Sequence, residues 1–167
     1  MPTRSLILLL AFLFLSLPTS RSQPAAGVGV AYHDLEEVGR WGVNGAFFIP
    51  VANHSFDIVP NFEYYYSKWT VNSMAEARDV YVIAVDAHAN VPDILSRLRT
   101  YFGTGVVYAG HGDEGGFGVN LSAGLYVRPV GWRVFPFGHV SYRLLADFEE
   151  IESLDAYFLR GGLRITL

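Results

Sequence analysis

A histidine and a serine two residues apart are the residues of this chain whose types best suit catalysis. They are His139 and Ser141, and the acids Glu149 and Glu152 follow downstream. Histidine, serine and a carboxylate can act as base, nucleophile and orienting acid in ester hydrolysis. Since residues two apart share one face of a strand, His139, Ser141 and Glu152 are the catalytic candidates if the chain is an enzyme.

Two other segments contain residue types that bind metals. Residues 111–116 read His-Gly-Asp-Glu-Gly-Gly, but the glycines indicate a flexible outer loop, and the sequence supports neither a ligand count nor a geometry. Acidic residues recur over 147–155 and are explained as a solvated outer loop. We therefore expect no metal site and no cofactor.

The composition limits the class of protein. The chain has 167 residues, of which 17% are charged, 51% hydrophobic and 15% aromatic, whereas about 25% charged residues is usual. This argues against a disordered segment. Twelve basic residues face 16 acidic ones and form no cluster along the sequence, so we expect no nucleic-acid partner. The lack of cysteine excludes a disulfide scaffold and a Cys-ligated zinc site.

The N-terminal 22 residues are interpreted as a cleaved signal peptide. Arg4 precedes an apolar run over 6–17, Pro18 ends the run, and Ser-Arg-Ser follows at 20–22. About a dozen apolar residues are too few to span a bilayer, which needs roughly 20. Residues 23–167 are then the exported chain. Without the two arginines of the signal peptide it has 10 basic and 16 acidic residues, a net charge of about −6.

The remaining chain alternates between apolar and polar residues in stretches of roughly ten. Period-two alternation is typical of strands with two different faces, and no helical segment is long enough to cover a sheet. The pattern therefore indicates an all-β, antiparallel up-and-down barrel. Eight strands are predicted, at 27–34, 40–51, 55–67, 78–90, 97–110, 117–128, 132–145 and 154–167.

The composition of the two strand faces indicates which face is outside. A soluble barrel would cover its exterior with lysine and glutamate, but this chain has a single lysine, Lys68, and its polar face is rich in glycine. An outer-membrane barrel has an apolar exterior and a polar lumen, and its strands need about 9–11 residues to span the bilayer. The sequence therefore predicts an eight-stranded transmembrane β-barrel.

The same topology predicts where the connections lie. With a periplasmic N-terminus, short turns are expected at 50–54, 91–96 and 129–131. The outer loops, which are usually longer, are expected at 35–39, 68–77, 111–116 and 146–153.

The polar face predicts a charged network inside the barrel. An eight-stranded barrel has an interior just wide enough for its own side chains, so a packed lumen is expected, with a narrow ion path as the alternative. Buried charges are costly unless paired, and acid–arginine bonds should stiffen the lumen. The predicted lumen residues are Asp57, Glu63, Asp86, His88, His139, Arg143, Arg160 and Arg164.

From about residue 27 to its end, the chain resembles the family of small bacterial outer-membrane β-barrel domains, the eight-stranded outer-membrane protein A/X type. The resemblance rests on Tyr-Phe-Gly-Thr-Gly at 101–105, the strand at 117–127 and the closing segment 159–167. It implies a cell outer-membrane location in Gram-negative bacteria, with outer-membrane lipid and lipopolysaccharide as surroundings. It also implies that the outer-membrane assembly machinery recognises the last strand, which ends in leucine where the family commonly has an aromatic residue. The residues of this assembly signal are Gly162, Leu163, Ile165 and Leu167.

Two other classes of barrel share short motifs with this chain. The His-x-Ser pair is similar to that of outer-membrane lipid A deacylases, but Tyr142 stands where those enzymes have asparagine. The predicted register also turns His139 and Ser141 into the lumen, away from lipid esters. Gly-Arg-Trp at 39–41 matches the Gly-x-Trp of lipocalins, secreted carriers whose barrel is followed by a helix.

We therefore expect a non-enzymatic outer-membrane barrel with a structural or surface-interaction role and no periplasmic domain after residue 167. A secreted lipocalin-like carrier of a small apolar ligand is the alternative. The sequence identifies no surface partner.

Overall fold

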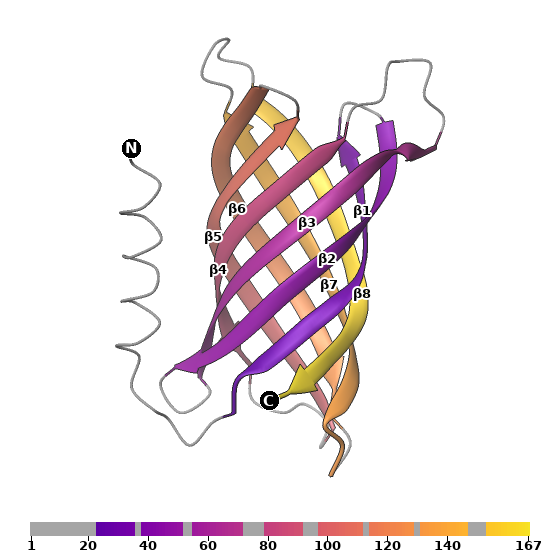
Figure 1. Cartoon of the computed structure of the whole chain (residues 1–167). Coiled ribbons are helices and arrows are strands. Elements are labelled where there is room, and N and C mark those ends of the chain that lie inside the picture. Colours follow the sequence, from indigo (N-terminus) through magenta and orange to yellow (C-terminus); the bar gives the residue numbers. More distant parts are fainter. Residues whose placement is uncertain are drawn as a thin grey trace, which may run out of the picture.

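The computed structural model shows a closed barrel of eight antiparallel strands (Figure 1). The structure describes residues 23–35, 38–51, 55–71, 79–91, 97–111, 114–128, 131–146 and 153–167, so the predicted signal peptide lies outside the described residues. The strands are β1 (Ala25–Leu35), β2 (Val38–Val51), β3 (Phe56–Val71), β4 (Val80–Asn90), β5 (Leu98–His111), β6 (Glu114–Val127), β7 (Val134–Ala146) and β8 (Ser153–Thr166).

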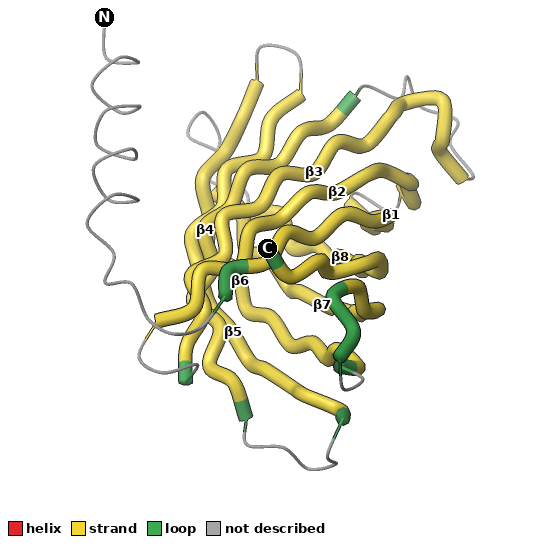
Figure 2. The backbone as a smooth tube through the Cα atoms, turned by 60° about the horizontal axis from the view of Figure 1, so that its bottom comes forward, coloured by secondary structure: helices red, strands yellow, loops and turns green. Residues whose placement is uncertain are grey.

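Each strand pairs with the next one in the sequence, and β1 pairs with β8 to close the barrel. The predicted fold class, an eight-stranded antiparallel up-and-down barrel, is confirmed. β1 begins and β8 finishes at the same end (Figures 1 and 2). We call this the terminal end and the opposite one the loop end. The described residues contain no helix long and apolar enough to cross a membrane.

Alternation along the strands separates the two faces of the sheet. In β7 every second side chain from Phe135 to Leu145 is buried, and the residues between them are exposed or half-exposed. In β2 the neighbours Phe47 and Phe48 are 55% and 3% exposed. The side-chain period of two therefore turns one set of residues into the barrel and the other outward.

The segment at 111–116, predicted as an outer loop, is largely strand. His111, the last residue of β5, pairs with Glu114, the first residue of β6, which leaves residues 112–113 between the strands. Gly115, one of the glycines that indicated flexibility, has a packing role instead, because a Cβ on it would collide with the Tyr108 ring. Its strand partner Gly110 lies against the Tyr81 ring in the same way. Glycines covered by aromatic rings in this way are a known device of β-sheets.

The prediction that the loops at one end of the barrel are longer than the turns at the other is wrong. The connections at the terminal end are 52–55, 91–97 and 128–133, and those at the loop end are 36–37, 72–79, 112–113 and 147–152. Two loop-end connections are thus shorter than every terminal-end one. The terminal-end turn before β7 contains Gly131 at φ 79°, a left-handed conformation that favours glycine. Loop length therefore does not indicate which end faces outward.

Candidate functional site

All eight predicted lumen residues lie inside the barrel, and none is more than 7% exposed. They come from four of the strands, β3, β4, β7 and β8, and occupy the middle and the terminal end of the interior. Apolar clusters lie on either side of the charged centre. One contains Tyr65, Val82, Leu145 and Phe158, and the other contains Tyr101, Tyr126, Phe135 and Phe137.

Glu63 is the centre of an ion-pair network that crosses the barrel. Its carboxylate, on β3, accepts two hydrogen bonds from the Arg143 guanidinium on β7, at 2.9 and 2.5 Å. Arg160 on β8 places Nη1 3.2 Å from Oε1 of Glu63, and the Tyr65 hydroxyl donates to Oε2 at 2.6 Å. Because β3 is not a sheet neighbour of β7 or β8, these bonds connect opposite walls of the barrel.

Asp86 on β4 forms the second half of the network. Its Oδ1 accepts a hydrogen bond from the Asn120 amide at 2.7 Å, and its Oδ2 accepts one from the Asn61 amide at 3.0 Å. Arg160 Nη2 and His88 Nε2 lie 3.9 and 3.8 Å from Oδ2. Arg160 therefore links the two buried carboxylates, which gives each charge in the low-dielectric interior a partner.

The terminal end of the interior contains a separate pair. Arg164 Nη2 lies 3.5 Å from Oδ2 of Asp57. The guanidinium also lies over the rings of Phe48 and Tyr126, with Cζ 3.9 and 4.6 Å from their centroids. The rings hold this guanidinium by cation–π contacts.

The catalytic candidates do not form a triad among the described residues. His139 Nδ1 lies 2.9 Å from the Tyr101 hydroxyl, and its Nε2 contacts Arg160. Both ring nitrogens are thus engaged away from Ser141, whose Oγ has no hydrogen-bond partner in the described part of the chain. Glu152 lies outside the described residues. His139 and Ser141 face the lumen and are 6% and 1% exposed.

The metal-ligand types at 111–116 do not form a described site. Residues 112–113 lie outside the described residues. Among those that the structure describes, no three His, Asp or Glu side chains are grouped closely enough to hold a metal ion.

Several residues of the lumen network were missed from the sequence although they share the inward face. They include Asn61 and Asn120, which bind Asp86, and Tyr65 and Tyr101, which bind Glu63 and His139. The signal that could have found them was alternation along each strand. Asn61 and Tyr65 lie two residues from Glu63 on β3, and Tyr101 and Asn120 alternate with the outward residues Phe102 and Val119 on β5 and β6.

The outward face of the barrel is apolar around its whole circumference. Among the described side chains of the eight strands, none that faces outward carries a charge. Large apolar residues fill this face and are substantially exposed, among them Val28, Val30, Val43, Phe62, Ile83, Val106, Val119, Leu121, Leu125, Val140, Leu159 and Leu163.

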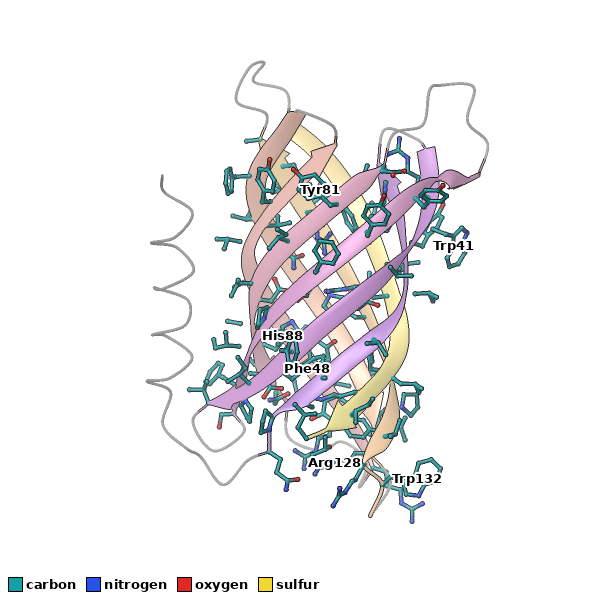
Figure 3. The ribbon with its side chains drawn as sticks, in the orientation of Figure 1. Trp41, Phe48, Tyr81, His88, Arg128 and Trp132 are labelled. Atoms are coloured by element: carbon teal, nitrogen blue, oxygen red, sulfur yellow. The ribbon has the colours of Figure 1, made fainter. Side chains whose placement is uncertain are left out.

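An aromatic belt surrounds the barrel near its loop end. Each strand contributes one outward ring: Tyr32, Trp41, Tyr64, Tyr81, Tyr108, Phe117, Tyr142 and Tyr157. Neighbouring rings touch, with centroids 5.2 Å apart for Tyr32 and Trp41, 4.7 Å for Tyr108 and Phe117, and 5.1 Å for Tyr142 and Tyr157. Toward the terminal end, further exposed rings are Phe47, Phe56, Phe102 and Trp132. Figure 3 shows Trp41 and Trp132 pointing outward at opposite ends.

A closed barrel with a charged interior and an aromatic-girdled exterior whose described side chains carry no charge has the architecture of small outer-membrane β-barrels. Structural comparison agrees. Neisserial surface protein A matches with a TM-score of 0.64 and 12% sequence identity, over 86% of this chain and 96% of that one. The N-terminal barrel domain of Pseudomonas aeruginosa OprF matches with a TM-score of 0.53 and 12% identity, over 86% and 98%.

A third match is Ail, the attachment invasion locus protein of Yersinia pestis, solved in complex with the heparin analogue sucrose octasulfate. Its TM-score is 0.51 at 13% identity, over 86% of this chain and 98% of that one. All three are eight-stranded outer-membrane β-barrels, so the predicted resemblance in fold is confirmed. No protein-family model matches the chain, and no curated protein matches it by sequence.

Proposed function

We propose that this chain is an integral outer-membrane β-barrel protein with a structural or surface-interaction role, no enzymatic activity and a lumen filled by side chains. The observation that carries the proposal is the uncharged outward face, which extends around all eight strands without a charged side chain in its described part. In water, contiguous apolar surface of this extent would drive association. In a bilayer it contacts lipid, and the closed sheet satisfies its own backbone hydrogen bonds.

The interior supports a packed lumen. The Glu63–Arg143 pair spans the barrel, and both side chains are fully buried. An ion path would have to break these bonds. A lipocalin-like carrier would need an apolar cavity, whereas the described apolar side chains point mainly outward and ion pairs occupy the middle of the barrel. The interior therefore favours the membrane barrel over both alternatives.

The location in the outer membrane is supported by the likeness in fold to three outer-membrane proteins. Residues 1–22 act as the export signal in this proposal. The partners are outer-membrane lipid, lipopolysaccharide and the assembly machinery. That machinery would meet the last strand, whose outward side chains Leu163 and Ile165 are 49% and 37% exposed beside β1.

Membrane fractionation tests this proposal. Expressed with residues 1–22 in a Gram-negative host, the protein should sediment with the outer membrane, resist alkaline carbonate and urea, and require detergent for release. A variant without residues 1–22 is the control and should remain in the cytoplasm. Recovery of the full-length product in the soluble periplasm would refute the proposal and favour the lipocalin-like carrier.

A further inference from the structure

Arginines that are scattered in the sequence converge at the terminal end of the barrel. Arg97 and Arg99 belong to the start of β5, Arg128 follows β6, Arg133 precedes β7, and Arg164 lies near the end of β8. The backbone connects these segments, because Arg128 N donates to Arg97 O at 2.8 Å and Thr166 N to Arg133 O at 2.8 Å. The arginines thus lie together at one end of the folded barrel, although they form no cluster along the sequence.

Three of these arginines line a cavity of about 140 Å³ in the mouth of the barrel. They are Arg99, Arg128 and Arg164, and Asp57 is the one carboxylate among the described residues that line it. The described part of the cavity wall thus contains three guanidinium groups and one carboxylate. Arg128 is exposed and Arg99 is half-buried, so a solute can reach the cavity from the terminal end, where Figure 3 shows Arg128.

Arg164 gives the cavity a rigid cationic side. It is 7% exposed, and its guanidinium is held over the Phe48 and Tyr126 rings. Its contact with Asp57 is a single long one at 3.5 Å, and its Nε has no hydrogen-bond partner in the described part of the chain. A guanidinium already held in place loses little side-chain entropy when it binds an anion.

We propose that this mouth is a binding site for a phosphate group, held by Arg99, Arg128 and Arg164. Guanidinium groups recognise phosphate through paired, charge-assisted hydrogen bonds, and the three arginines outnumber the single described carboxylate beside them. At about 30 Å³ per water, the cavity has the room of four to five waters, which suits a phosphate group.

The phosphate can come from a lipid headgroup or from a soluble phosphomonoester. Exposed Trp132 lies in the turn between Arg128 and Arg133, and tryptophan is enriched at the membrane–water interface. This places the mouth near headgroup level. Both sources share the chemistry of the site, and the experiment separates them.

The test is a calorimetric titration of the folded full-length mature protein in zwitterionic detergent, at constant ionic strength, with glycerol phosphate and with acetate. Glycerol phosphate should bind at least about tenfold more tightly than acetate. R128Q should weaken phosphate binding by about 10- to 100-fold, because it removes a charged hydrogen-bonding group from the site. R133Q removes an arginine at the same end that does not line the cavity and should change the affinity less than about threefold.

R128Q replaces an exposed side chain, and an unchanged unfolding midpoint in detergent will show that it folds. Equal losses in R128Q and R133Q, no preference over acetate, or no binding by the folded wild-type protein would each overturn the proposal. The source is determined in nanodiscs. Glycerol phosphate binding that is weaker in phosphatidylglycerol discs than in a phosphate-free detergent, with no such difference for R128Q, supports the site with a lipid occupant. Equal binding in the discs and in the detergent supports it with a soluble one.

Discussion

Replacing Glu63 by glutamine is expected to destabilise the barrel by ~3–5 kcal/mol, the range for removing one partner of a buried ion pair. Glutamine keeps the volume of the side chain but removes the charge that faces Arg143 at 2.5 Å and Arg160 at 3.2 Å. Two buried guanidinium groups are then left with Asp86, whose nearest guanidinium contact is 3.9 Å. Urea unfolding in lipid vesicles, followed by tryptophan fluorescence, measures the loss.

Asp57 provides the matched control for this prediction. Its pair with Arg164 is a single contact of 3.5 Å near the mouth, and D57N should cost roughly 1 kcal/mol or less. The double variant E63Q/R143M should recover about half of the stability that E63Q loses, because R143M removes a guanidinium that E63Q leaves buried without its partner. If E63Q is no more destabilising than D57N, the Glu63 network does not hold the walls together.

Placing an arginine at Leu121 is expected to reduce stability in the membrane by ~2–4 kcal/mol, the cost of this side chain near the middle of the bilayer on a barrel exterior. Leu121 lies in the middle of β6, faces outward and is 58% exposed. For a soluble barrel the same substitution would exchange an exposed leucine for a charge in water and would be neutral or improve solubility. A lipid-facing barrel and a soluble barrel thus predict different effects of this substitution, which folding titrations into vesicles will distinguish.

Val127 serves as the control on the same strand. It faces the same side but is the last residue of β6, at the terminal end, where an arginine reaches the interface at a cost of about 0–1 kcal/mol. A large loss for L121R with a small one for V127R supports a lipid-facing exterior. Equal effects of the two, or increased solubility of L121R, would contradict it.

The alternation of side chains made the barrel and its two faces predictable. In β4, the sequence Val-Tyr-Val-Ile-Ala-Val-Asp-Ala-His already assigns Asp86 and His88 to one face and Ile83 to the other, and the structure has them so. Closure could also be inferred, because eight such strands without helices leave no other cover for their edges.

The partners inside the barrel could not be predicted. Glu63 and Arg143 are 80 positions apart, and whether they meet depends on the tilt and stagger of all the strands between them. The same stagger brings Arg99, Arg128 and Arg164 to one cavity. Gly115 was misleading for a local reason. Its small size accommodates the neighbouring Tyr108 ring as well as it would a flexible turn, and the sequence does not separate the two uses.

Gel migration in SDS shows whether this barrel is a closed, lipid-facing one. Protein from the outer-membrane fraction is run in SDS unheated and after boiling. A closed membrane barrel has every backbone hydrogen bond inside its own sheet, so we predict that the unheated protein stays folded and migrates differently from the boiled one. Recovery from the soluble periplasm, with identical migration in both lanes, would contradict the account.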